Sequence, residues 1–165
     1  MRKHVFLGIC LLGILGIILS CSTEASENYI KVDKIKEFTL EIGSIIPQSF
    51  LDVNQSSTQI LASPSQTFSK YNVLVKGIKY EIGVDSEKTI AFISTSDENF
   101  STPENIRVGM GLMEALQISH ADMLIEKGWA SYLTLKSGWN AAFKLQADNT
   151  FNINDSVAFV FMRKN

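Results

Sequence analysis

The stretch that decides the fold runs from residue 78 to residue 96 and reads IKYEIGVDSEKTIAFISTS. Polar and apolar side chains alternate at its start, which predicts a strand whose buried face begins at Ile78 and ends at Val84. Residues 85–88 have turn-forming composition, and residues 89–96 return as a second apolar run. The stretch therefore predicts an antiparallel hairpin with one face in the core.

The last third of the sequence predicts three further strands, at residues 129–135, 139–145 and 157–162. Alternation places Trp129 and Leu133 on one face of the first of them, and this face continues through Phe143 of the second. Tyr132 falls on the opposite face to Trp129 and is expected at the surface. We interpret Trp129 and Tyr132 as a possible partner-binding surface.

Weaker strand signals precede the hairpin. Residues 37–42 alternate between polar and apolar, which predicts a half-buried strand with one face running from Phe38 to Ile42. Residues 58–62 and 72–76 are rich in side chains that favour strands. These runs extend the expected sheet toward the N-terminus.

The helical signals lie between residues 111 and 128. Gly111 stands at an N-cap position, with Glu114 three residues on. Ser119 repeats the start signal, and Gly128 supplies a left-handed stop, which favours two short helices over one long helix. The predicted fold class is α+β, an antiparallel sheet with two short helices in the middle of the chain.

Residues 106–116 read IRVGMGLMEAL. Around Val108, Gly109, Met110 and Glu114 this stretch resembles the strand end, Gly-Met pair and helix start of small envelope lipoproteins of the BamE/SmpA type. The resemblance implies a helical pair packed on an antiparallel sheet. It carries over no functional residue.

The N-terminus has the layout of an export signal. Basic residues at positions 2–4 precede an apolar run from residue 5 to residue 19, and a small residue, Ser20, follows. Spanning hydrocarbon takes about 20 apolar residues, so a cleaved signal fits this shorter run better than a permanent helix. An uncleaved anchor stays open as an alternative.

The four residues 18–21, Ile-Leu-Ser-Cys, resemble the lipobox of bacterial lipoproteins, although the first two depart from its commonest form. The resemblance implies that the Cys21 thiol takes a diacylglyceryl group and that Cys21 becomes the new N-terminus. Cys10 does not fit, because β-branched Ile9 stands where the signal peptidase needs a small residue. An ordinary secretory signal with an incidental Cys21 is the other alternative.

We expect a lipoprotein signal peptide at 1–20, a lipid-anchored flexible tether at 21–28 and a single α+β domain at 29–165.

Charge argues against a nucleic-acid partner. The formal net charge of the chain is −2, and it becomes −4 once Arg2 and Lys3 leave with the signal. No basic stripe remains to follow a phosphate backbone. Ser22 follows the cysteine where an aspartate retains enterobacterial lipoproteins at the inner membrane, so the lipobox resemblance implies the outer membrane.

Candidate catalytic residues are sparse in this sequence. His120 is the one histidine after the signal, and Asp122 lies two positions on, where side chains of a helix do not face each other. The acidic loop residues Asp97, Glu98 and Glu104 are the other candidates. We predict no catalytic residue, no cofactor and no metal ligand.

These signals together favour a lipid-anchored protein of the cell envelope. The poverty of motifs indicates a non-enzymatic module that binds a protein or glycan partner or assists envelope assembly. The alternative is a hydrolase or metal-dependent enzyme that uses loop carboxylates with His120. Its expected partners are the membrane, through the N-terminal lipid, and an envelope protein or glycan.

Overall fold

The computed structural model describes residues 29–32, 38–52 and 58–164. The expected signal peptide, Cys21 and the tether at 21–28 lie outside these residues. Within them, nine strands form one mixed sheet in the order β1-β3-β4-β5-β9-β8-β7-β6, with β2 also paired to β3. The strands are β1 (Ile30–Lys31), β2 (Gln59–Ser63), β3 (Gln66–Val75), β4 (Ile78–Val84), β5 (Ile90–Thr95), β6 (Met123–Glu126), β7 (Ala130–Thr134), β8 (Asn140–Phe143) and β9 (Val157–Arg163); the helices are α1 (Gln48–Asp52) and α2 (Leu112–Ser119).

The α+β prediction is wrong, because the described chain is mostly β-sheet with two short helices. Only α2 lies in the middle of the chain, whereas α1 precedes β2. The second predicted helix is strand β6 instead, antiparallel to β7. The helical pair that the envelope-lipoprotein resemblance implied is therefore not formed.

The end of α2 explains why no second helix follows. Gly111 is the N-cap, as predicted, but the helix ends at His120, whose φ of 51° is left-handed. Ser119, expected to start another helix, instead accepts a hydrogen bond from the Ala121 N–H (3.2 Å) in the turn. The open edge of β7 then pairs with the following residues, and such tertiary pairing overrides weak helical propensity. Gly128, expected as a helix stop, is left-handed (φ 78°) between β6 and β7.

The predicted central hairpin is confirmed as β4 and β5. Their antiparallel register places Ile82 opposite Ile93 and Glu81 opposite Ser94. The expected face of β4, with Tyr80 and Ile82 at its centre, packs into a core cluster of buried side chains. The turn between the strands is fixed by Asp85, which accepts hydrogen bonds from the backbone and side chain of Thr89.

The prediction of a strand at residues 37–42 is wrong for residues 38–42, the part of it that the structure describes. Phe38, Leu40 and Ile42 do pack against the same core cluster, so the alternating burial is as predicted. No ladder forms along them, and backbone hydrogen bonds to Ile90 begin only at Gly43 and Ser44, beside an isolated bridge from Ile45 to Thr89. Alternation reports which face is buried and does not by itself supply a partner strand.

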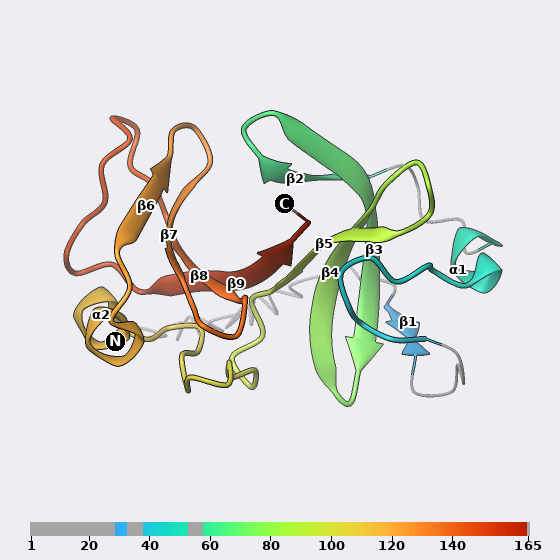
Figure 1. Ribbon diagram of the computed structural model, residues 1–165, viewed down its shortest axis with the longest axis horizontal. Coiled ribbons are helices and arrows are strands. Elements are labelled where there is room, and N and C mark those ends of the chain that lie inside the picture. Colours follow the sequence, from blue (N-terminus) through green and yellow to red (C-terminus); the bar gives the residue numbers. More distant parts are fainter. Residues whose placement is uncertain (1–28, 33–37, 53–57, 165) are drawn as a thin grey trace, which may run out of the picture.

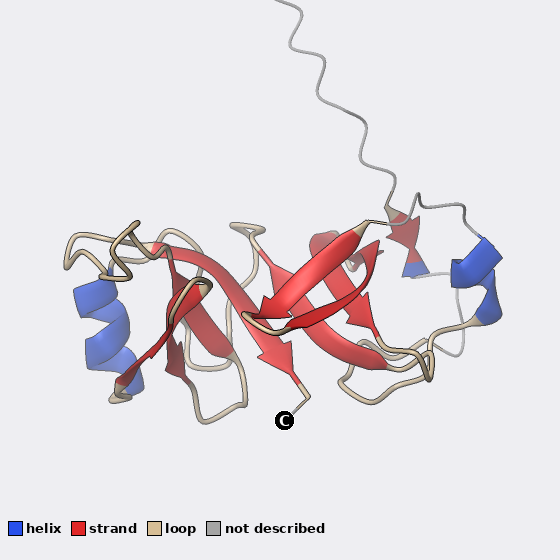
Figure 2. Ribbon diagram, turned by 90° about the horizontal axis from the view of Figure 1, so that it is seen from above, coloured by secondary structure: helices blue, strands red, loops and turns tan. Residues whose placement is uncertain are grey.

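The predicted C-terminal meander is confirmed as β7, β8 and β9. Strand β9 lies between β8 and β5 in the centre of the sheet and joins the two halves of the chain. In Figure 1 the sheet curls, so that β2 and β6 rise on either side of the C-terminal end of β9. Figure 2 shows α1 and α2 at opposite ends of an elongated molecule.

The two faces of the curled sheet carry different cores. The outer face holds two buried clusters, one under α2 and one under the N-terminal segment, and Phe100 and Trp139 pack against both. The inner face holds a third cluster centred on Phe92, Tyr132 and Phe161. In the described part of the chain, no helix is long and apolar enough to cross a membrane.

Candidate functional site

A groove runs over the inner face of the sheet and continues past the ends of β4 and β5. It consists of two pockets, of about 270 Å³ and about 550 Å³. Both pockets are lined by Glu81, Thr95 and Ser96, so the two hollows adjoin one another. We call this continuous hollow the inner groove, with an apolar half and a polar half.

The apolar half forms because the β2–β3 hairpin folds over the neighbouring strands. Ile60 and Leu61 of β2 form one wall, and Phe92 and Phe159 line the other side. The close approach depends on Gly83 of β4, since a Cβ there would lie 3.0 Å from side-chain atoms of Ile60, Phe68 and Phe92. Half-buried Phe159 leaves ring surface available to a ligand.

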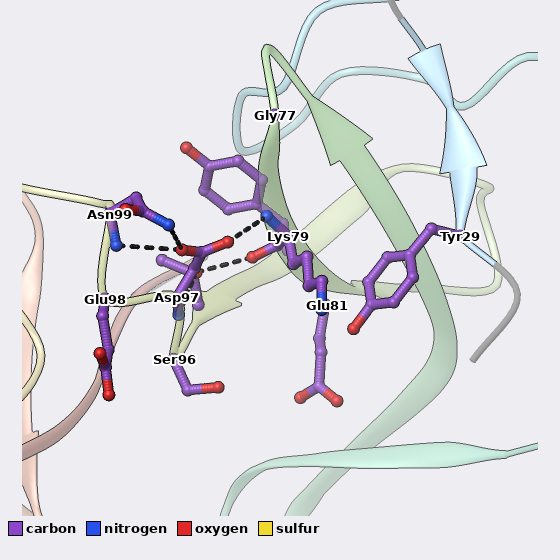
Figure 3. Close-up of a pocket in the computed structure, with 10 residues that line it drawn as sticks. Tyr29, Gly77, Lys79, Glu81, Ser96, Asp97, Glu98 and Asn99 are labelled. Atoms are coloured by element: carbon purple, nitrogen blue, oxygen red, sulfur yellow. Dashed lines mark hydrogen bonds between the residues drawn. The ribbon is translucent and has the colours of Figure 1, made fainter. Parts of the chain in front are cut away.

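The polar half is organised around Asp97, which follows β5. Its carboxylate accepts hydrogen bonds from the Lys79 N–H and the Asn99 N–H, each 3.0 Å long. Figure 3 shows Asp97 held between these two partners, with the side chains of Ser96 and Glu81 beside it. The Lys79 N–H, opposed by partial burial and helped by Asn99, lowers the pKa of Asp97 below its usual range.

Charged side chains surround this carboxylate. Glu98 is exposed, and Glu81 forms an ion pair with Lys70 of the neighbouring strand. The Lys79 ammonium lies over the Tyr29 ring, 5.5 Å from its centre, on the far side of the pocket. The polar half is thus lined by three carboxylates, and Arg107 lines a neighbouring hollow together with Glu98.

The phenol of Tyr80 also lines the polar half. Burial, followed by the negative charge of Asp97, raises the pKa of Tyr80 above its usual range. Tyr80 therefore stays a neutral hydroxyl at physiological pH. Its ring packs into the core cluster and edge-on against Phe100, so Tyr80 adds no charge to the polar half.

Trp129 and Tyr132, the pair interpreted as a partner-binding surface, belong instead to a cluster of side chains at one end of the inner face of the sheet. We call Glu126, Trp129, Tyr132 and Arg163 the Arg163 cluster. Tyr132, expected at the surface, is only 6% exposed, and its ring lies 6.2 Å from that of Trp129 on the same face. The prediction of opposite faces is wrong because Trp129 lies in the turn before β7, outside the strand alternation.

The Arg163 guanidinium sits at the centre of this cluster. It donates to both carboxylate oxygens of Glu126 and to the Tyr132 hydroxyl (3.0 Å), and Tyr132 donates to Glu126 (2.7 Å). It also donates to the carbonyl of Ala62 in β2 (3.3 Å). The hydrogen bonds from Arg163 lower the pKa of Glu126, against partial burial, so the carboxylate stays ionised.

Trp129 makes a second link to β2, because its indole N–H donates to the Leu61 carbonyl at 3.0 Å. Strand β2 lies at one end of the curled sheet, while Trp129 and Glu126 belong to the β6–β7 end. The Arg163 cluster therefore ties the two ends of the sheet together across its inner face. This tie holds the β2 wall of the inner groove in place.

The structure separates the candidate catalytic residues. His120 is exposed at the end of α2, and Glu104 is held by the backbone N–H (2.7 Å) and hydroxyl (2.9 Å) of Ser137. Of these candidates, Asp97 and Glu98 line one pocket together, the polar half of the inner groove. Among the described residues, no three His, Cys, Asp or Glu side chains lie close enough to hold a metal ion.

Strand β6 presents a second exposed surface. It lies at the end of the sheet order, and Leu124 and Ile125 are each 46% exposed. An edge strand with two exposed apolar residues and no charge between them can add a partner strand. Leu124 and Ile125 line neither half of the inner groove, which combines apolar walls with hydrogen-bonding groups and is the more specific candidate.

Sequence reasoning missed the inner groove. Its apolar half depends on β2 folding back over β4, and no local pattern shows this contact between distant residues. One signal was available, because an isolated glycine inside an alternating strand, such as Gly83, often marks a close approach of another segment.

Comparisons with known proteins show no family for this chain. No protein-family model matches it, and no curated protein matches its sequence. Among solved structures it is similar to the uncharacterized protein yfeY from Escherichia coli, with 14% identity and a TM-score of 0.49, covering 83% of this chain and 100% of that chain. It is also similar to an extracellular protein containing an SCP domain from Bacillus anthracis, with 14% identity and a TM-score of 0.38, covering 80% of this chain and 48% of that chain. At these scores and identities, neither likeness bears on function.

Proposed function

We propose that the protein is a lipid-anchored binding protein of the cell envelope, held at the outer membrane by Cys21, and that the inner groove receives its partner. The observation that carries the binding role is the groove itself, in which an apolar half adjoins a half lined with hydrogen-bonding groups. Ligand sites commonly combine apolar walls with a few fixed polar groups. The Arg163 cluster fixes one wall, so the groove is preformed.

The chemistry of the groove supports binding over catalysis. A general acid or base works best with a pKa near the operating pH, and the pKa of Asp97 is shifted away from that range. Its oxygens accept hydrogen bonds from the backbone of Lys79 and Asn99, which gives Asp97 a structural role. His120 does not line either half of the groove. The hydrolase alternative therefore lacks an acid-base pair at this site.

The anchor is tested by lipid labelling in bacteria. Cells that express the full chain are grown with an alkyne fatty acid, and Cys21→Ala is compared with Cys10→Ala as the matched control. We expect Cys21→Ala to lose the label and to accumulate the uncleaved precursor, whereas Cys10→Ala is labelled normally. Retained label on Cys21→Ala would exclude Cys21 as the lipidated residue.

Binding at the groove is tested by site-specific photo-crosslinking in the native membrane. A photoreactive amino acid replaces exposed Ser96, which lines both halves of the groove, and exposed Glu87 in the β4–β5 turn serves as control. We expect a discrete crosslinked protein or glycan from position 96 and not from position 87. Identical products, or none, from the two positions would refute the binding role of the groove.

A further inference from the structure

We infer that the inner groove recognises an extended segment of a protein partner in which a large apolar residue stands close to a lysine or arginine. This inference rests on the proposed function and names the partner class for the same site. The apolar residue occupies the half between β2 and Phe159, and the basic residue enters the polar half beside Glu98.

The size and walls of the apolar half suit one side chain. Its volume of about 270 Å³ is at the lower end of ligand pockets, so it holds a single large group and no extended apolar ligand. Ile60, Leu61 and Phe159 supply apolar contact, and exposed Ala158 leaves the mouth open. A leucine or phenylalanine side chain matches this space.

The charge of the polar half selects the basic residue of the partner segment. Of the carboxylates that line the polar half, Glu81 is paired with Lys70, and Asp97 is held by the backbone N–H groups of Lys79 and Asn99. Glu98 is exposed and forms no ion pair within the described residues, so its carboxylate is the one available to a ligand. A lysine or arginine side chain of the partner supplies the complementary charge.

The two halves meet at Glu81, Thr95 and Ser96, so one short segment reaches both. In an extended chain, side chains two residues apart point to the same side with a rise of about 3.3 Å per residue. A segment with the apolar and basic residues at this spacing presents both to the groove. A neutral glycan offers no positive charge to the Glu98 carboxylate, whereas a basic residue does.

Three peptides test the inference on the full chain in lipid nanodiscs, each carrying the same neutral dye as an amide on its N-terminal amine: dye-GFGKG-NH2, dye-GFGEG-NH2 and dye-GAGKG-NH2. Fluorescence anisotropy measures each Kd at low and physiological salt. We expect the peptide with both Phe and Lys to bind at least about tenfold more tightly than either of the others, a difference of about 1.4 kcal/mol. Its affinity falls with added salt, because the basic contact is exposed.

Variants locate the two contacts. Glu98→Gln should reduce the preference for Lys over Glu in the peptide, while the matched control Glu87→Gln, in the turn at the other end of the hairpin, leaves it unchanged. Ala158→Trp should block the apolar half and remove the preference for Phe over Ala. Both Glu98 and Ala158 are exposed, so these variants keep the core intact.

Equal Kd values for the three peptides, or equal effects of Glu98→Gln and Glu87→Gln, would overturn the inference. Binding of a chitin oligosaccharide at the groove, without binding of the peptides, would also overturn the inference. In each of these cases a crosslink at position 96 would leave the proposed function standing. Loss of both peptide binding and the position 96 crosslink would refute the proposed function as well.

Discussion

The Arg163 cluster offers the sharpest quantitative prediction, because its central ion pair can be removed one partner at a time. Arg163→Met keeps the apolar stem of the side chain, and Glu126→Gln keeps the shape of the carboxyl group. The two side chains are 21% and 23% exposed, which places the pair between a surface pair and a buried one. The double-mutant cycle isolates their interaction from the other effects of each substitution.

The expected coupling energy follows from this partial burial. Exposed ion pairs contribute about 0–1 kcal/mol, whereas breaking a fully buried pair costs about 3–5 kcal/mol. Two hydrogen bonds join Arg163 to Glu126, and both groups keep some water contact. We therefore expect a coupling of about 1–2 kcal/mol.

Urea unfolding of the full chain, followed by tryptophan fluorescence, gives the four free energies of unfolding. The pair Lys70–Glu81, with side chains 22% and 41% exposed, provides a comparison cycle, for which we expect less than about 1 kcal/mol. A coupling below about 0.3 kcal/mol for Arg163–Glu126 would mean that the ion pair does not hold strand β6 against β9.

Three further predictions follow from the same contacts. The pKa of Glu126 is lowered in the folded state, so the stabilisation that its ionised carboxylate gives is present above the unfolded pKa of about 4.3 and is lost as the pH falls through the folded pKa. The free energy of unfolding should therefore fall less steeply with decreasing pH for Glu126→Gln than for the native chain. Parallel curves of the two proteins would contradict this. Gly83→Ala should destabilise the fold by about 1–3 kcal/mol in urea unfolding and weaken peptide binding, because the new Cβ meets three side chains at 3.0 Å; an unchanged urea midpoint would show that the β2–β3 hairpin can move away freely. Trp129→Phe removes the N–H donor to Leu61 and should cost about 0.5–1.5 kcal/mol, measured by thermal unfolding, with no effect on lipid labelling.

Sequence patterns predicted the hairpin and the meander because both depend on residues close in the chain. The alternation from Ile78 to Val84 is local, and the turn at Asp85 connects neighbouring strands. The same holds for β7 and β8, whose register pairs Leu133 with Ala141. In these segments local pattern and final contacts agree.

Local patterns failed where a distant segment decides the structure. The stretch after Ser119 carries helix-start signals, yet it forms a strand because the edge of β7 is available to it. Trp129 departs from the predicted alternation because it lies in the turn before β7, where its indole donates to the Leu61 carbonyl, 68 positions away. Partners this far apart leave no periodic trace in the sequence.

The candidate site was the least predictable part. Asp97 and Glu98 were singled out as acidic loop residues, and they do line the polar half of the inner groove. The apolar half was not predicted, since Ile60 and Phe159 come from strands far apart in sequence. Residue type indicates which chemistry is present, whereas strand order decides which residues meet.

The central claim is that the inner groove, and not the exposed edge strand β6, receives the partner. Amide chemical shifts of the isotope-labelled full chain in nanodiscs test it most directly, measured during titration with the peptide segment identified by crosslinking at position 96. We predict that the amides of Lys79, Ser96 and Phe159 shift together and saturate with one Kd. Shifts confined to Leu124 and Ile125 of β6, with the groove residues unmoved, would contradict it.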